Sequence, residues 1–217
     1  MNTEPDLLFD GPGDASQTIV LAHGAGTGMD STFMNFFACA LAKRKFRVAR
    51  FEFPYIANYR ATRKKRPPDR EPILRETWRK VVKTLGPKGL VIGGKSMGGR
   101  VASLVADEGG VGGLVCLGYP FHPVGKPDHL RVEHLQAIKT QTLILQGERD
   151  TFGNREEVPR YELSSAVRIK WIEDGDHSFK PRKTSGRTEQ RNWEAALEEI
   201  VAFLGPCQWQ IPVKADS

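Results

Sequence analysis

Residues Gly89–Gly98 (GLVIGGKSMG) place a short apolar run, Leu90–Ile92, directly before a glycine-rich turn that carries Ser96. A short apolar run rich in β-branched residues is typical of a buried strand, whose N–H groups are paired in a ladder. The residues that follow, Gly99–Ala106, supply a helix. The segment therefore predicts a strand, a tight turn with a serine at its apex, and a helix, in that order.

The same segment matches two motifs that imply different chemistry. Residues 89–96 fit GxxxxGK[ST], the phosphate-binding P-loop, and residues 94–98 fit G-x-S-x-G, the nucleophile elbow. In a P-loop the four variable positions form a loop whose N–H groups turn inward to hold phosphate oxygens. Three of those positions are here Leu90–Ile92, and holding a phosphate would break the strand. We therefore favour the elbow, with Lys95 as a flanking surface charge beside the pocket, and keep a P-loop nucleotide hydrolase as an alternative.

Length and composition predict an ordinary globular protein. The chain has 217 residues, of which 39% are hydrophobic and 27% are charged. It is long enough for one well-buried core and too short for two comfortable domains. We expect a single domain over residues 1–217, with a core at about 18–204 and a short polar tail at 206–217.

Cysteine usage and the N-terminal sequence bear on the cellular compartment. Cys39, Cys116 and Cys207 are odd in number and widely spaced, without metal-ligand spacing, which favours a reducing compartment. Residues 1–13 lack the progression of a signal peptide, and no apolar stretch approaches the length of a membrane span. We expect a cytoplasmic protein that does not enter a membrane, and the sequence leaves its oligomeric state open.

The net charge of +6 is concentrated in one segment. Residues 60–70 (RATRKKRPPDR) hold six basic residues and one acid, a net charge of +5, so the rest of the chain is nearly neutral. A nucleic-acid binder usually spreads its basic residues along a face and interleaves aromatic residues, which this segment lacks. We expect a solvated loop. The sharper hypothesis is that Arg63–Arg66 attract an anionic substrate or partner, and a nucleic-acid-binding module is a more distant alternative.

Strand-like and helix-like patterns alternate along the chain. The expected strands are Thr18–Ala22, Phe46–Phe53, Leu90–Ile92, Leu114–Leu117, Thr142–Gln146 and Val167–Ile172. Helical spacing of apolar residues occurs over Ser31–Arg44, Glu71–Leu85 and Thr188–Leu204. Regular alternation of this kind predicts an α/β fold with a mostly parallel central sheet and helices on both faces.

Four of the expected strands lead into a polar side chain of catalytic type. In open parallel sheets, functional groups collect beyond the carboxyl ends of the strands, so these side chains are expected at one edge of the sheet. They are His23, Ser96, Asp150 and His177. The last three occur in the order nucleophile, acid, base.

Short motifs at these strand ends resemble those of the α/β-hydrolase superfamily. They are HGAG at residues 23–26, GKSMGG at 94–99, GERD at 147–150 and GDHSF at 175–179, and the likeness spans roughly residues 18–204. The chain looks most like small, cap-less members of the dienelactone hydrolase and carboxylesterase type. The stretch between Leu117 and Asp150 is too short for a full lid domain. The resemblance thus implies a single-domain α/β-hydrolase fold without a lid.

The resemblance also implies a role for each site residue. Ser96 Oγ is the nucleophile, His177 is the base that takes its proton, and Asp150 fixes the histidine tautomer. The backbone N–H groups of Ala25 and Met97 form an oxyanion hole. The implied function is a serine hydrolase that cleaves an ester, thioester or related acyl bond of a small substrate through an acyl-enzyme, with no cofactor and no metal ion.

Several of these residues also have a purely structural explanation. Ser96 is in a position to cap the helix that follows it. The acids that compete with Asp150 are Glu148, Asp174 and Asp176. Asp176 is adjacent to His177 in sequence, so its carboxylate is poorly placed to orient the same ring.

The remaining histidines carry weaker signals. His23 is expected to orient the oxyanion loop, and His122 is either a pocket-lining residue or a plain loop residue, whereas His129 and His134 give no signal. The loops near residues 55–70 and 119–134 are expected to shape the pocket. Because fold does not imply function, a non-catalytic interaction protein on the same fold remains the main alternative.

Overall fold

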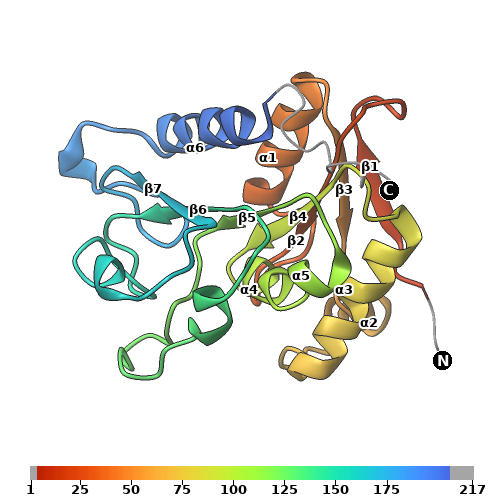
Figure 1. The fold of residues 1–217 in the computed structure, drawn as a ribbon, viewed down its shortest axis with the longest axis horizontal. Coiled ribbons are helices and arrows are strands. Elements are labelled where there is room, and N and C mark those ends of the chain that lie inside the picture. The colour runs from red at the N-terminus through yellow and green to blue at the C-terminus, as the bar shows by residue number, and fades with distance from the viewer. Residues whose placement is uncertain (1–3, 206–217) are drawn as a thin grey trace, which may run out of the picture.

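A seven-stranded β-sheet runs through the molecule, with helices on both of its faces (Figure 1). The computed structural model describes residues 4–205, so the predicted tail at 206–217 and Cys207 lie outside the described residues. The strands are β1 (Leu7–Asp10), β2 (Thr18–Ala22), β3 (Arg47–Phe51), β4 (Leu90–Lys95), β5 (Gly113–Leu117), β6 (Thr142–Gly147) and β7 (Val167–Ile172). The helices are α1 (Thr32–Lys43), α2 (Pro54–Thr62), α3 (Glu71–Leu85), α4 (Met97–Ser103), α5 (Ala106–Gly109) and α6 (Glu189–Leu204). Short 3₁₀ helices cover Glu133–Gln136, Val158–Arg160 and Lys183–Ser185. No helix within residues 4–205 is long and apolar enough to cross a membrane.

The strand order across the sheet is β1-β3-β2-β4-β5-β6-β7. Strands β2 to β7 run parallel to their neighbours, and β1 pairs antiparallel with β3 at one edge. Parallel neighbours need crossover connections, which α1, α3, α4 and α5 supply within the sheet. The segment from β5 to β6 (residues 118–141) contains only one 3₁₀ helix. The predicted mostly parallel α/β fold without a lid is thus confirmed.

Successive residues of each strand point into two separate cores. Ile19 and Leu21 of β2 pack with α1 and α6, whereas Val20 and Ala22 of the same strand pack with α3 and α4. In Figure 1, α1 and α6 lie above the sheet and α2 to α5 lie below it. Trp78 of α3 is fully buried, and its indole N–H donates to the Gly98 carbonyl in α4 at 3.3 Å. The second core therefore reaches the segment that follows β4.

Two elements of the structure have no counterpart among the predicted ones. Strand β1 is a partly exposed edge strand, where Phe9 is 42% exposed and lies under the Arg47 guanidinium. Helix α2 buries only Tyr55. It begins directly after the predicted strand Phe46–Phe53 and includes the first residues of the basic segment 60–70. The helix predicted after the elbow begins earlier, at Met97, and is divided into α4 and α5.

We expect Gly93→Ala to destabilise the fold, because a Cβ at Gly93 would overlap the carbonyl of Val115 on the neighbouring strand β5. Strand β4 is paired on both sides, so its backbone cannot shift away from one neighbour without disturbing the other. The free energy of unfolding, measured by urea denaturation, should fall by about 1–3 kcal/mol. Gly13→Ala is the matched control, since a Cβ there would meet no atom within 4 Å. Equal losses in the two variants would contradict the packing of β4 on β5.

Candidate active site

Ser96 stands at the sharp turn between β4 and α4. Its backbone has φ 51° and ψ −116°, in a region of positive φ that a side chain occupies only under strain. Ser96 precedes the first residue of α4, but its side chain makes no capping hydrogen bond to that helix. The predicted strand, turn and helix are therefore present, and the hydroxyl of Ser96 does not cap the helix.

Glycines allow this turn to lie directly against the end of β2. A Cβ at Gly98 would lie 2.5 Å from the Ala22 carbonyl oxygen and 2.6 Å from that of His23, so only glycine fits there. On the facing loop, a Cβ at Gly24 would lie 3.7 Å from the Ser96 Cβ. The backbone that follows β2 is thereby held beside the serine.

The three side chains predicted to act together are joined by hydrogen bonds. His177 Nε2 lies 2.8 Å from Ser96 Oγ, and His177 Nδ1 lies 2.7 Å from Asp150 Oδ2. Asp150 follows β6 and His177 follows β7, so three strands bring their groups to the same edge of the sheet. With the carboxylate on Nδ1, that nitrogen carries the proton and Nε2 is free to accept one from the serine.

Asp150 is fully buried and is held on both of its oxygens. The side-chain amide of Gln146 donates to Oδ2 at 2.9 Å, and the backbone N–H of Phe152 donates to Oδ1 at 2.9 Å. The ring of Phe152 lies 4.3 Å from the imidazole of His177, centroid to centroid. These contacts fix both the carboxylate and the ring that it orients.

The environment of His177 keeps it neutral at lower pH than usual. Burial lowers the pKa of His177 below its ordinary value of 6.5, the hydrogen bond with Asp150 raises it, and the positive charge of Lys95 lowers it again. The net direction is downward. The neutral imidazole, which can accept a proton, is thus favoured.

One of the two backbone N–H groups predicted for an oxyanion hole is next to the serine in sequence, and the other lies on the loop that faces it. Met97 is the residue after Ser96, and Ala25 follows Gly24, which faces the elbow. Across residues 4–205, neither of these N–H groups donates a hydrogen bond. Both are therefore available to a substrate oxygen.

The loop that carries Ala25 is anchored from α2 and from Phe53, the residue before that helix. The Tyr55 hydroxyl donates to the Ala25 carbonyl at 2.9 Å. His23 is completely buried, with Nδ1 on the Gly24 carbonyl at 2.7 Å and Nε2 accepting from the Phe53 N–H at 3.1 Å. His23 is placed as predicted, to orient this loop, whereas the role of Tyr55 was not predicted.

The acids that compete with Asp150 are engaged elsewhere. Glu148 pairs with Arg155 and accepts from the Asp174 N–H, and Asp174 itself pairs with Arg182. The carboxylate of Asp176 accepts from the backbone N–H groups of residues 178 and 180, within its own loop. Asp150 is the acid whose carboxylate hydrogen-bonds His177 within the described part of the chain.

Two other histidines make contacts that do not reach the Ser96 site. His122 is buried, with Nε2 on Glu157 at 3.2 Å, so it is a structural loop residue rather than an exposed pocket wall. His134 Nε2 lies 2.8 Å from Ser103 Oγ, a second serine–histidine contact. The Ser103 hydroxyl, however, donates to the Arg100 carbonyl, and burial lowers the pKa of His134 to about 4. This pair also lacks a carboxylate on its histidine within residues 4–205.

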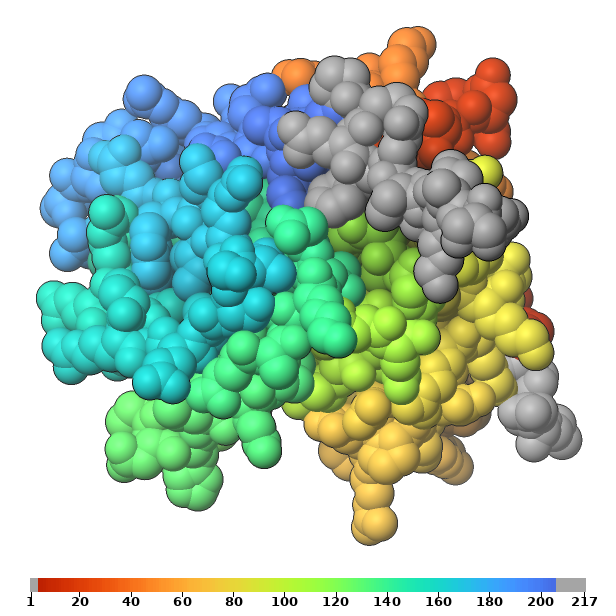
Figure 2. Space-filling view, in the orientation of Figure 1, coloured from red at the N-terminus to blue at the C-terminus, as the bar shows by residue number. Residues whose placement is uncertain are grey.

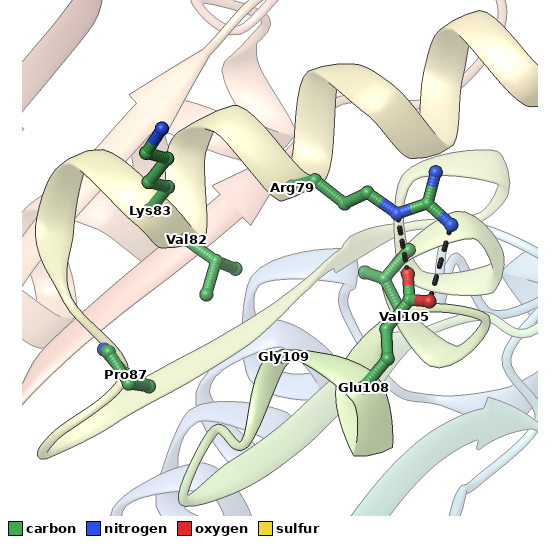
Figure 3. A pocket seen from close by; sticks show the side chains of 7 residues that line it. All are labelled: Arg79, Val82, Lys83, Pro87, Val105, Glu108 and Gly109. Carbon is green, nitrogen blue, oxygen red and sulfur yellow. Dashed lines mark hydrogen bonds and ion pairs between the residues drawn. The ribbon is translucent and has the colours of Figure 1, made fainter.

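Lys95 is buried, contrary to the predicted surface charge, with 8% of its surface exposed. The G-x-S-x-G pattern gives no signal for this burial, because the motif leaves the residue before the serine unspecified. A separate hollow between α3 and α5 is lined by Arg79, Val82, Lys83, Pro87, Val105, Glu108 and Gly109 (Figure 3). An Arg79–Glu108 ion pair crosses its rim, and it contains none of the predicted site residues.

Beyond the carboxyl ends of the parallel strands, a serine is hydrogen-bonded to a histidine, and that histidine is hydrogen-bonded to an aspartate. This arrangement is typical of an α/β protein with a hydrolase-like site. The family model described as an alpha/beta hydrolase domain matches residues 15–205. This protein belongs to the alpha/beta hydrolase family.

Solved structures with the same fold include proteins without a lid. The chain is similar to an alpha-beta serine hydrolase homologue from Coxiella burnetii, with TM-score 0.69 and 19% identity over 92% of this chain and 91% of that one. It is similar to a serine hydrolase without lid from Xanthomonas campestris, with TM-score 0.69 and 18% identity over 94% and 91%. It is also similar to a dienelactone hydrolase from Anabaena variabilis, with TM-score 0.62 and 17% identity over 90% and 97%. At these identities the likeness shows the fold, which is that of a cap-less α/β hydrolase.

We expect the imidazole of His177 to titrate below pH 6.5, since burial outweighs its stabilisation by Asp150. In Asp150→Asn the carboxylate that favours the imidazolium is lost, so the pKa should fall further. The Cε1–H chemical shift of His177, followed by NMR against pH, measures both values. Glu157→Gln is the control, because that carboxylate bonds His122 and should leave the titration of His177 unchanged. A pKa that rises in Asp150→Asn would contradict the described contact.

Proposed function

We propose that this protein is a serine hydrolase that cleaves an ester, thioester or related acyl bond of a small substrate through an acyl-enzyme. The observation that supports this most strongly is the hydrogen-bonded series from Ser96 through His177 to Asp150. The family and its structural neighbours support a hydrolase. The carboxylesterase-like specificity and the role of each residue are part of the proposal. The expected single domain and cytoplasmic location stay predictions.

In the first half-reaction, His177 Nε2 takes the proton of Ser96 while Oγ forms a bond to the substrate carbonyl carbon. The tetrahedral intermediate then collapses, and the bond to the leaving group breaks. The leaving group departs with the proton that His177 carried, and the acyl group stays on Ser96. Asp150 holds the imidazole in the required tautomer and stabilises the imidazolium that forms between these two transfers.

In the second half-reaction, His177 takes a proton from water while the water oxygen attacks the acyl carbon. Ser96 leaves with that proton, and the carboxylic acid product is released. In both halves, negative charge collects on the former carbonyl oxygen, where the N–H groups of Ala25 and Met97 would receive it. Loss of one such donor typically lowers the rate by about 10²–10³-fold.

A non-catalytic interaction protein on the same fold is the alternative. Such a protein would have no need of a serine at a positive φ with its hydroxyl on a neutral histidine. A residue with only a structural role is expected to have an unstrained backbone. The strain at Ser96 is explained if the turn serves to present Oγ at its apex. The geometry therefore supports the enzyme over the scaffold.

We expect a fluorophosphonate probe to label the protein covalently at Ser96, since an activated serine attacks the phosphorus of such probes. Ser96→Ala should abolish labelling while its far-ultraviolet circular dichroism matches the parent protein. Ser103→Ala is the matched control, because it removes the other serine that contacts a histidine, and its labelling should persist. Absence of labelling in the parent protein would contradict the proposed function.

The proposal extends to an anionic substrate, on account of the basic segment after α2. Arg60 pairs with Glu52 and Asp30, whereas Arg63–Arg66 are exposed and have no acidic partner within residues 4–205. In Figure 2 the gold part of the chain, which contains this segment, projects from the lower edge of the molecule. Helix α2, from which the segment emerges, contacts the Ala25 loop through Tyr55. These positive charges would raise the local concentration of an anionic ester.

We expect Lys64→Glu/Lys65→Glu to lower kcat/KM for a carboxylated nitrophenyl ester by about tenfold at low salt. The value for neutral p-nitrophenyl acetate should change by less than about twofold, and the difference should shrink as sodium chloride is added. Lys43→Glu/Lys88→Glu is the matched control. These exposed lysines precede β3 and β4, at the amino ends of the strands, whereas the site lies beyond the carboxyl ends. Equal salt dependence for the two esters would refute steering by the basic segment.

A further inference from the structure

Lys95, the last residue of β4, sends its side chain to the loop that carries His177. Its ammonium group donates a hydrogen bond to the backbone carbonyl of His177 at 2.6 Å. The ring of Phe33, from α1, lies on the other side, 5.5 Å from Nζ. The residue that precedes the serine in the chain is therefore bonded to the residue that would activate that serine.

Gly118 provides the space in which this contact forms. Gly118 follows β5, which lies between β4 and β6 in the sheet, and its φ is +69°. A Cβ there would lie 2.7 Å from the His177 carbonyl oxygen, 3.1 Å from Lys95 Nζ and 3.3 Å from His177 Nδ1. Only a glycine at this position lets the lysine reach across the end of β5 to the histidine loop.

The ammonium group sits among acids from two loops. Burial lowers the pKa of Lys95 to about 8, and the negative charges of Asp150 and Asp176 oppose that effect. Since this pKa lies above that of His177, Lys95 carries its positive charge through the pH range in which His177 titrates. The groups that face His177 are thus Asp150, Asp176 and Ser96, together with the Lys95 cation and the Phe152 ring.

We propose that Lys95 is a positioning residue of this site: through the space left by Gly118 it holds the His177 backbone in place relative to Ser96 and sets a positive charge beside the imidazole. The proposal rests on the proposed function and assigns a task to the variable position of the G-x-S-x-G motif. Lys95 does not touch the reacting atoms, and it acts only through His177.

The sign of the charge effect follows from electrostatics. A cation beside an imidazole disfavours the imidazolium, so the Lys95 charge lowers the pKa of His177, after burial as the larger cause. Removing the charge should raise that pKa and move the acid limb of activity to higher pH. A lysine that served only to fill space would not move the limb when replaced by an apolar side chain of similar size.

The experiment compares the parent protein with Lys95→Met and Lys95→Arg, using p-nitrophenyl acetate hydrolysis from pH 4.5 to 8.5. In Lys95→Met the acid limb of kcat/KM should shift upward by about half a unit or more. The plateau above the limb should fall roughly tenfold, because the His177 carbonyl loses its donor and the ring is less well placed. Lys95→Arg keeps the charge and the donors, so its limb should stay at the parent position. Lys170→Met, which removes a lysine of β7 that pairs with Glu199 of α6, is the matched control and should match the parent in both respects.

The NMR titration of His177 in the same variants reads the charge effect without any substrate. A limb and an NMR pKa that both stay unmoved in Lys95→Met would overturn the proposal, as would a plateau within twofold of the parent. A parent protein that fluorophosphonate does not label would defeat the proposed function instead, and the NMR comparison would still decide whether Lys95 sets the charge state of His177. Urea unfolding of Lys95→Met shows whether the variant is folded at the assay temperature.

Discussion

The close backbone contact between the turn after β4 and the end of β2 is the constraint on which the rest of this site depends. At Gly98, the carbonyl oxygens of Ala22 and His23 at the end of β2 occupy the space that any side chain would need. This contact fixes where α4 begins, which in turn fixes the direction of Ser96 and of the Met97 N–H. It also brings the loop after β2 beside the serine. From the other side, the buried Trp78 of α3 donates its indole N–H to the Gly98 carbonyl and holds the same turn in place.

The parts of the fold that were predicted from sequence are those with strong local patterns. The runs Thr18–Ala22 and Val167–Ile172 coincide with β2 and β7, and Glu71–Leu85 coincides with α3. Strand β1 is short and half exposed, and its stability comes from pairing with β3, which no local pattern encodes. Helix α2 has almost no apolar face, so its periodicity gives no signal.

The candidate site, too, could be predicted only in those parts that local sequence patterns define. Ser96, Asp150 and His177 could be predicted because each follows an expected strand, and parallel strands end at one edge of the sheet. Their mutual distances and the contact of Lys95 with the His177 loop depend on residues that are far apart in sequence. Lys95 shows the limit clearly, because the motif that located Ser96 treats the preceding position as free, and a lone lysine on a strand end is usually solvated.

The positive φ of Ser96 sets stability against the proposed activity at a single residue. A serine in this conformation costs roughly 1–3 kcal/mol relative to an unstrained backbone, whereas glycine would adopt it with little strain. With glycine at position 96 the protein should therefore be harder to unfold and would lack the proposed nucleophile. Thermostability screens that do not measure turnover would select that variant. The strain at Ser96 is thus the backbone feature expected of a catalytic serine, and it can be seen before any substrate is known.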